Sequence, residues 1–254
     1  MISVGQLYKT LNEKIPPSLS CEWDNDGLMC CPDPDVPVKG VLLALDITEG
    51  MIEQAIKENC NVILSHHPLV FRPVKALNTE KGVPRKLIKL VKNEISAMSF
   101  HTRLDALSGG VNDVLANLIG LENSIPFGEG TEDMGRVGIF PTSSLEEFAA
   151  HIKKKLGSPF VLYCGNRTVR RVAILGGNGD DFISAAKAAG ADTYVSGRLG
   201  YHPLSTAIED GINLIEAGHF YTENPVLPFL ASLVKNADPT IPTIISDSCE
   251  IHSL

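Results

Sequence analysis

Apolar and polar positions alternate along this chain in blocks whose lengths and spacings predict strands and helices in turn. Short aliphatic runs, which are typical of buried strands, occur at 41–45, 62–64, 95–100, 135–140, 160–163, 171–175, 193–195 and 212–216. Apolar residues at helical spacing occupy most of the intervals, at 4–15, 49–59, 84–93, 111–119, 145–156, 182–189 and 205–210. Strands that alternate with helices form βαβ units, in which the two strands run parallel. The pattern therefore predicts an α/β protein with mainly parallel sheets flanked by helices.

The elements predicted in the second half of the chain repeat the order found in the first half. In each half, three strands separated by two helices lead to a histidine and, four residues later, to an acidic residue. These pairs are His101 with Asp105 and His219 with Glu223. Two copies of so long a pattern indicate an internal duplication of a βαβ-based unit.

The duplication sets the expected domain organisation. The polar, glycine-rich stretch 128–138 lies between the two copies, and we interpret it as their junction. We therefore expect two similar α/β domains, at 1–126 and 127–254, with the C-terminal segment packing back on the first domain. A chain of 254 residues is long enough to bury a core in each of them.

Two adjacent histidines, His66 and His67, follow the predicted strand at 62–64 and precede Pro68. Neighbouring residues of a strand point to opposite faces. The two imidazoles can therefore share one ligand cluster only if the backbone turns there, which Pro68 favours. They could also face different metal ions or, taken alone, be unrelated polar residues that cap the strand. In the second copy we place Tyr201 and His202 at the matching position.

Polar groups of two kinds, imidazole and carboxylate, gather at the predicted strand ends. One histidine and one carboxylate could act as an acid–base pair without metal, but this set is larger, and crowding it without a cation would desolvate charge at high cost. Six nitrogen and oxygen ligands without sulfur suit one six-coordinate ion, or two ions about 3.5–4 Å apart. We therefore predict a centre of two divalent ions (Zn, Mn, Fe, Co or Ni) held by His66, His67, His101, Asp105, His219 and Glu223.

Three other features are given structural or minor roles. Trp23 precedes the turn-forming residues 24–27, and we interpret it as a core residue beside a structural turn, with a direct substrate contact as the alternative. The glycine-rich residues 176–179 could cradle a phosphate, but they lack the G-x-G-x-x-G order and precede two aspartates. Asp46 ends a strand at the same sheet edge but belongs to no repeated motif, so we expect it to matter less for metal binding than Asp105.

Composition narrows the class of protein further. The net charge is −8 and no run of basic residues exceeds 153–155, which argues against nucleic-acid and anionic-membrane partners. The six cysteines include no C-x-x-C pair, and we interpret them as reduced thiols. No apolar stretch reaches the length of a membrane span, and the N-terminus lacks a signal-peptide pattern. A cytoplasmic location is predicted.

Taken together, the motifs resemble those of the Nif-three-like dinuclear metal family, whose members are often named GTP cyclohydrolase I type 2. The matching motifs span essentially the whole chain: W-D-N-x-G-L at 23–28, S-H-H-P at 65–68, H-T-x-x-D at 101–105, G-R-V-G at 135–138 and G-H-x-x-x-E at 218–223. The resemblance implies the same six metal ligands, two interleaved α/β domains and a ring-shaped homohexamer. Arg198 departs from the acidic residue that family members often carry at that position.

Two functions follow from this site. The first is a dinuclear metal-dependent hydrolase that acts on an anionic small molecule, since the cations outweigh the two carboxylates. The resemblance makes a GTP cyclohydrolase-type opening of a nucleotide ring the specific form of this hypothesis. His202 is the candidate for proton transfer, with a structural histidine as its alternative. The second function is a non-enzymatic, oligomeric metal-binding scaffold with a protein partner or a role in metal handling.

Overall fold

We describe a computed structural model of the chain, which covers residues 1–80, 82–129, 132–246, 249 and 251. The described residues form two compact units. The first unit holds 1–104 and 227–246, and the second holds 105–226 with 249 and 251. The chain therefore passes from one unit to the other after Leu104 and again after Val226, and residues 249 and 251 are grouped with the second unit once more.

This division differs from the expected boundary between residues 126 and 127. The helix that follows the first histidine–carboxylate motif packs its apolar side chains into the core of the second unit, so the first crossing comes earlier in the chain. Residues 227–246 pack in the first unit.

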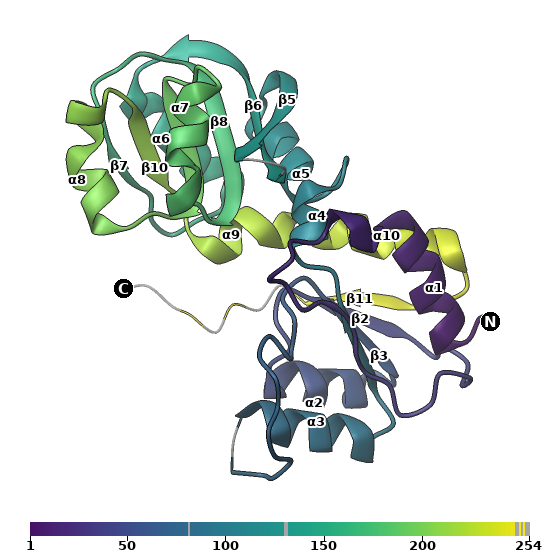
Figure 1. Cartoon of the computed structure of the whole chain (residues 1–254). Helices are drawn as coiled ribbons and strands as arrows, with labels where there is room; N and C mark the ends of the chain where they lie inside the picture. The colour runs from purple at the N-terminus through teal and green to yellow at the C-terminus, as the bar shows by residue number, and fades with distance from the viewer. Residues whose placement is uncertain (81, 130–131, 247–248, 250, 252–254) are drawn as a thin grey trace. The chain divides into compact units, whose positions relative to one another are not determined.

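The first unit contains a five-stranded sheet in the order β1-β4-β3-β2-β11, in which only β1 is antiparallel to its neighbour. Helices α2 and α3 cover one face of this sheet, and α1 and α10 cover the other (Figure 1). The three central strands are buried along their whole length, as expected for parallel strands covered on both faces. The elements are α1 (Val4–Lys14), β1 (Gly27–Cys30), β2 (Val41–Ala44), α2 (Glu49–Lys57), β3 (Val62–Ser65), α3 (Gly82–Lys92), β4 (Ser96–Ser99), α10 (Leu227–Ala237) and β11 (Thr243–Ile245), with a 3-10 turn at Pro17–Leu19.

The second unit contains a six-stranded mixed sheet in the order β5-β6-β8-β9-β10-β7. Strands β8, β9 and β10 are parallel, and the other pairings are antiparallel. The elements are α5 (Val111–Ile119), β5 (Glu122–Glu129), β6 (Glu132–Ser143), α6 (Leu145–Leu156), β7 (Leu162–Cys164), β8 (Val169–Asn178), α7 (Ile183–Ala188), β9 (Thr193–Arg198), α8 (Tyr201–Asp210), β10 (Asn213–Glu216) and α9 (His219–Glu223), with 3-10 turns at Asp180–Phe182 and Asn224–Val226. The short helix α4 (Thr102–Ala106) contains the first crossing between the units.

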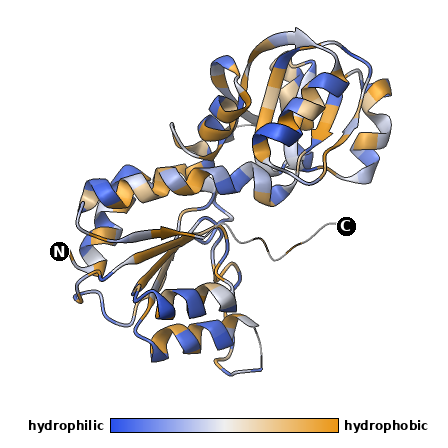
Figure 2. Ribbon diagram, turned by 180° about the vertical axis from the view of Figure 1, so that it is seen from behind, coloured by the Kyte–Doolittle hydropathy of each residue, from blue (hydrophilic) through white to orange (hydrophobic). Residues whose placement is uncertain are grey.

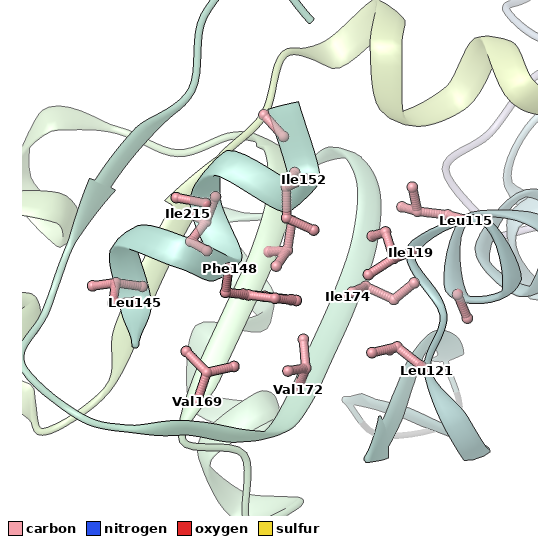
Figure 3. Packing of buried hydrophobic residues seen from close by; sticks show 14 residues of the cluster. Leu115, Ile119, Leu121, Leu145, Phe148, Ile152, Val169, Val172, Ile174 and Ile215 are labelled. Carbon is pink, nitrogen blue, oxygen red and sulfur yellow. The ribbon is translucent and has the colours of Figure 1, made fainter. Parts of the chain in front are cut away.

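The core of the second unit explains why α5 belongs to it. Leu115 and Ile119 of α5 pack with Phe148 of α6 against Val172 and Ile174 of β8 (Figure 3). Figure 2 shows the matching pattern in the ribbon, with apolar strands and with helices that are apolar along one side only. Burial of this apolar stripe is the main source of stability for helices of this length.

The glycine-rich stretch at 128–138 is not the junction predicted from the sequence. Its described residues belong to β5 and β6, an antiparallel pair in which Phe127 lies opposite Gly135. A side chain on Gly135 would collide with the Phe127 ring, because a Cβ there would lie 2.3 Å from the nearest ring carbon. Glycine is therefore required by the packing of a strand rather than by a linker.

The element order confirms the duplicated α/β framework. The series α1-β1-β2-α2-β3-α3-β4-α4 in the first copy corresponds to α6-β7-β8-α7-β9-α8-β10-α9 in the second. In both copies the strand before the parallel series pairs antiparallel with its last strand. The helix that follows each copy packs in the other unit, α5 against α6 and α10 against α1. This exchange of helices is what interleaves the two units.

No helix in the described part of the chain is long and apolar enough to cross a membrane. The cysteines are all free thiols. The cytoplasmic location stays a prediction.

Candidate metal centre

Three imidazoles meet at the carboxyl ends of β3 and β4 in the first unit. His66 and His67 directly follow β3, and His101 follows the neighbouring parallel strand β4. One nitrogen from each ring lies within 4.8 Å of the others, and the ring centroids are 5.0 to 5.7 Å apart. The backbone turns after Ser65, whose hydroxyl donates to the carbonyl of His67 at 2.7 Å. This turn is what allows adjacent residues to present both imidazoles to one cluster.

The Nδ1 atom of each of these histidines is held by an oxygen acceptor. The acceptors are the Phe100 carbonyl at 3.0 Å from His66, Asp46 at 2.9 Å from His67 and Asp24 at 2.8 Å from His101. A neutral imidazole that donates from Nδ1 carries its lone pair on Nε2. Metal-binding histidines commonly have such a partner, which fixes the ring and makes it a better ligand. In the neutral form, the three rings therefore carry their lone pair on Nε2.

Asp24 is the buried partner of His101. Its other oxygen accepts hydrogen bonds from the backbone nitrogen of Thr102 at 3.0 Å and from the Thr102 hydroxyl at 2.6 Å. Burial by itself raises the pKa of Asp24, but the hydrogen bonds from His101 and Thr102 outweigh it and hold the pKa well below its ordinary value. Asp24 is therefore a carboxylate that positions His101.

The same turn holds the start of α4 through Asp26. One Asp26 oxygen accepts from the His101 backbone nitrogen at 2.9 Å and from Nε of Arg103 at 2.8 Å. The Arg103 guanidinium is buried, donates to the Ile15 carbonyl at 2.9 Å and lies 4.5 Å from the centre of the Phe100 ring. The turn is structural, as predicted, and it supports the imidazole cluster.

One sequence-based interpretation near this cluster was wrong: Trp23 is not a core residue, since 59% of its surface is exposed. Asp46 contacts His67 directly, and its smaller importance for metal binding than Asp105 stays a prediction. Neither partner carboxylate belongs to the repeated motif, and only the strand-end position of Asp46 and the turn around Asp24 could have suggested them.

The second unit contributes the other histidine and both predicted carboxylate ligands. His219 and Glu223 lie one turn apart on α9, with 2.9 Å between Nε2 and Oε2. A carboxylate oxygen of Asp105 lies within 4.8 Å of one from Glu223, and both side chains are buried. Two buried carboxylates this close repel each other unless a proton or a cation lies with them. This donor set fits a hard or borderline divalent ion.

Glycines at the end of β8 make room for α9. Gly177 has a φ of +70°, and a Cβ there would lie 2.2 Å from Oε1 of Glu223. Its backbone nitrogen donates to the Thr222 hydroxyl at 3.2 Å, and the nitrogen of Gly176 donates to the Asn112 side chain at 2.8 Å. These contacts give the glycine-rich stretch a role in seating the ligand helix rather than a phosphate.

Arg136, the charged residue of the G-R-V-G motif, supports the segment that carries Asp105. The Arg136 guanidinium is buried, pairs with Asp113 and donates to the carbonyls of Ala106 and Leu107 at 3.4 Å each. Burial raises the pKa of Asp113, but hydrogen bonds from Arg136 and Gly109 outweigh it and lower that pKa. The arginine of this motif thus holds the chain just after Asp105 in place.

His202, the candidate for proton transfer, lies exposed in the first turn of α8. Among the residues that the structure describes, it belongs to none of the clusters that could hold a metal ion. The strand register also places Gly197 and Arg198, not Tyr201 and His202, at the positions that match His66 and His67. The Arg198 side chain is exposed, and nothing in the described part of the chain explains its departure from the acidic residue.

The fold and the site together define a class: α/β proteins with a duplicated framework and strand-end groups of histidine and carboxylate that could hold metal ions. Across residues 2–249 the chain matches the family described as Duf34/NIF3 (NGG1p interacting factor 3), and it belongs to that family.

Three related proteins match this chain over nearly its full length. A protein of Clostridium perfringens named GTP cyclohydrolase 1 type 2 homolog is 34% identical, with 96% of each chain covered. Among solved structures, the Staphylococcus aureus protein SA1388 superposes with a TM-score of 0.89 at 29% identity, covering 100% of this chain and 99% of that one. Reduced HcgD from Methanocaldococcus jannaschii has a TM-score of 0.85 at 30% identity, covering 97% and 98%.

Proposed function

We propose that this protein is a metal-dependent hydrolase with a dinuclear centre held by His66, His67, His101, Asp105, His219 and Glu223. The observation that carries the proposal is the set of three Nδ1 contacts in the first unit, to the Phe100 carbonyl, Asp46 and Asp24. Structural histidines need no such partner at Nδ1, whereas metal-binding histidines commonly donate their second ring nitrogen to a carboxylate or a carbonyl. Two ions are proposed because the donor set exceeds one tetrahedral site.

The substrate we propose is an anionic small molecule, and a nucleotide is the specific candidate. Bound divalent ions would activate water near neutral pH and stabilise developing negative charge. Asp24 and Asp46 orient two of the imidazoles toward that task. The names of relatives as GTP cyclohydrolase 1 type 2 homologs support a purine ring-opening reaction as the first to test. The proton-transfer role of His202 stays a prediction.

A metal-binding scaffold without turnover is the alternative, and one surface feature favours assembly. Strand β7 is the outer strand of its sheet and exposes Leu162 and Tyr163, with Phe160 just before it. Exposed apolar edge strands are sites of association. We therefore propose that the protein assembles, and the homohexamer implied by the family resemblance is the form to test. The mass of the protein in solution, measured by light scattering, is that test.

The experiment for the proposed function uses one preparation in two states. The protein is stripped with a chelator, reloaded separately with Zn, Mn, Fe, Co or Ni, and assayed against purine and pyrimidine nucleotides for ring opening and phosphate release. We expect turnover that appears on reloading and that His101→Ala abolishes. His151→Ala is the matched control, because His151 bonds the Ile119 carbonyl away from the cluster. Metal binding without turnover by any loaded form would favour the scaffold.

A further inference from the structure

Three aromatic rings form an open corner beside the imidazole cluster. We call Trp23, Phe71 and His101 the aromatic corner. The ring centroids are 6.2 Å apart for Trp23–Phe71, 6.3 Å for Trp23–His101 and 6.2 Å for Phe71–His101. The interplanar angles are 67°, 79° and 89°, so the rings stand nearly perpendicular to one another.

The corner is exposed although it is apolar. Trp23 is 59% and Phe71 45% exposed, which is unusual for side chains that lose much free energy by remaining in water. Nevertheless the backbone next to both residues is held in place. Asp24 fixes the backbone beside Trp23 through Thr102, and the Asn25 side chain donates to the carbonyl of Val70, next to Phe71. A fixed, exposed aromatic surface is suited to bind a flat ring without ordering cost.

A cavity with positive charge adjoins the same phenyl ring. Phe71, Arg72 and Lys75 line a cavity of about 520 Å³ together with aliphatic residues of the 69–84 region. The described residues that line it include both of these cations and no carboxylate. The volume is in the range of small-ligand sites, and the two cations suit phosphate oxygens. Phe71 therefore borders a surface for a flat ring on one side and a site for an anion on the other.

We propose that the aromatic corner binds the base of a nucleotide and that Arg72 and Lys75 bind its phosphates. This deepens the proposed function, on which it rests for the identity of the reacting group, because the base would lie next to His101. A substrate with a ring but no charge, or with charge but no ring, would use only half of the surface.

Trp23 is the only tryptophan, so its fluorescence reports on this corner directly. The full-length protein is titrated with GTP, guanosine and inorganic triphosphate, with and without metal, and N-acetyltryptophanamide corrects for absorbance. We expect GTP and guanosine to quench Trp23 saturably, and GTP to bind most tightly. Phe71→Ala should weaken GTP and guanosine about tenfold, the effect of losing one stacking partner, and change triphosphate little.

Two further variants separate the halves of the surface. Arg72→Gln with Lys75→Gln should weaken GTP and triphosphate and leave guanosine unchanged. Leu77→Ala is the control, since Leu77 is 66% exposed in the same loop but lines neither the corner nor the cavity. Equal affinities for Phe71→Ala and Leu77→Ala, or triphosphate binding as tight as GTP, would overturn the proposal. The proposal would also be overturned if iodide did not quench Trp23 fluorescence in the native protein, because another molecule of the protein would then cover the corner.

The binding test fails separately from the proposed function. Phe71-dependent nucleotide binding without turnover would leave the aromatic corner standing and refute the hydrolase. Metal-dependent turnover of a substrate that lacks an aromatic ring, with no quenching by nucleotides, would do the reverse.

Discussion

The two copies of the framework use the same strand end for different purposes. Ser65 in β3 and Ser196 in β9 occupy matching positions in register, but His66 and His67 follow the first and Gly197 and Arg198 follow the second. A Cβ on Gly197 would lie 2.4 Å from the Thr222 hydroxyl and 2.8 Å from Cα of His219. In the second copy, α9 therefore packs directly against the position at which the first copy carries His66.

The difference also extends to the partners of the ligands. The histidines of the first copy are backed by oxygen acceptors from other elements, whereas His219 pairs through Nε2 with its own helix neighbour Glu223. Of the six proposed ligands, the first copy therefore supplies three histidines, each with an oxygen partner at Nδ1, and Asp105, whereas the second supplies His219 and Glu223. The two copies thus differ mainly in the residues that follow β3 and β9.

Arg136 holds the chain after α4 through hydrogen bonds to the carbonyls of Ala106 and Leu107. We expect the loss of its partner to lower the free energy of unfolding more than any other change discussed below. Asp113→Ala leaves the buried Arg136 charge without its partner, so we expect a loss of about 3 kcal/mol of unfolding free energy. The measurement is urea denaturation at pH 7. A loss below about 0.5 kcal/mol, the scatter of surface substitutions, would contradict it.

The same pair sets a pH dependence. Because the pKa of Asp113 is lower in the folded than in the unfolded chain, its stabilisation is complete above about pH 4 and is lost as the pH falls toward the folded-state pKa. Wild type should therefore lose more stability than Asp113→Ala over that acidic range.

Removing metal should destabilise the wild type, because the proposed ligands come from both copies. An ion at a hundredfold excess over its dissociation constant adds about 2.7 kcal/mol to the native state, so chelation should lower the melting temperature by about 5 °C. Glu223→Ala should lose most of this sensitivity. The copies do not share metal if Glu223→Ala responds to chelator as the wild type does.

The oxygen partners peculiar to the first copy should tune metal affinity. Asp24→Asn and Asp46→Asn should each weaken metal binding about 10- to 100-fold, as expected for residues that orient ligands. Asp105→Ala should cost more than either, since Asp105 is a proposed ligand. Calorimetric titration measures all three, and an affinity equal to wild type for Asp24→Asn would remove the role given to this contact.

The smallest loss of stability should come from adding a side chain at the end of β9 in the second copy. Gly197→Ala should cost about 1–2 kcal/mol because the new methyl group meets backbone atoms. Gly82→Ala, where a Cβ would meet nothing within 4 Å, is the control and should change stability little. Thermal melts of the two variants would settle whether α9 excludes larger residues there.

Much of this molecule was predictable because it follows from pattern. The βαβ periodicity predicted the parallel strands, and the repeated H-x-x-x-D/E spacing placed His101 and His219 just after strands β4 and β10, with Asp105 and Glu223 four residues further on in α4 and α9. The family was recognised from the motifs and is confirmed.

What the sequence could not provide depends on contacts between distant residues. Asp24 lies 77 residues from His101, and no local periodicity links them. The glycine-rich stretch at 128–138 is predicted as the junction of the two halves, but its glycines serve side-chain packing between two strands, and only the pairing of β5 with β6 reveals that. The crossing after Leu104 was missed for a similar reason, since the apolar face of α5 carries no mark of which unit it packs in.

Metal content per chain tests the proposed centre most directly. Wild type, His66→Ala, Glu223→Gln and His151→Ala are stripped, reloaded, freed of unbound metal and analysed for metal and protein. We expect about two ions per chain in wild type and His151→Ala, because the donor set exceeds one tetrahedral site. His66→Ala and Glu223→Gln, one variant from each copy, should each lose at least one ion. Only trace metal in the wild type, or two ions retained in Glu223→Gln, would contradict a centre built from both copies.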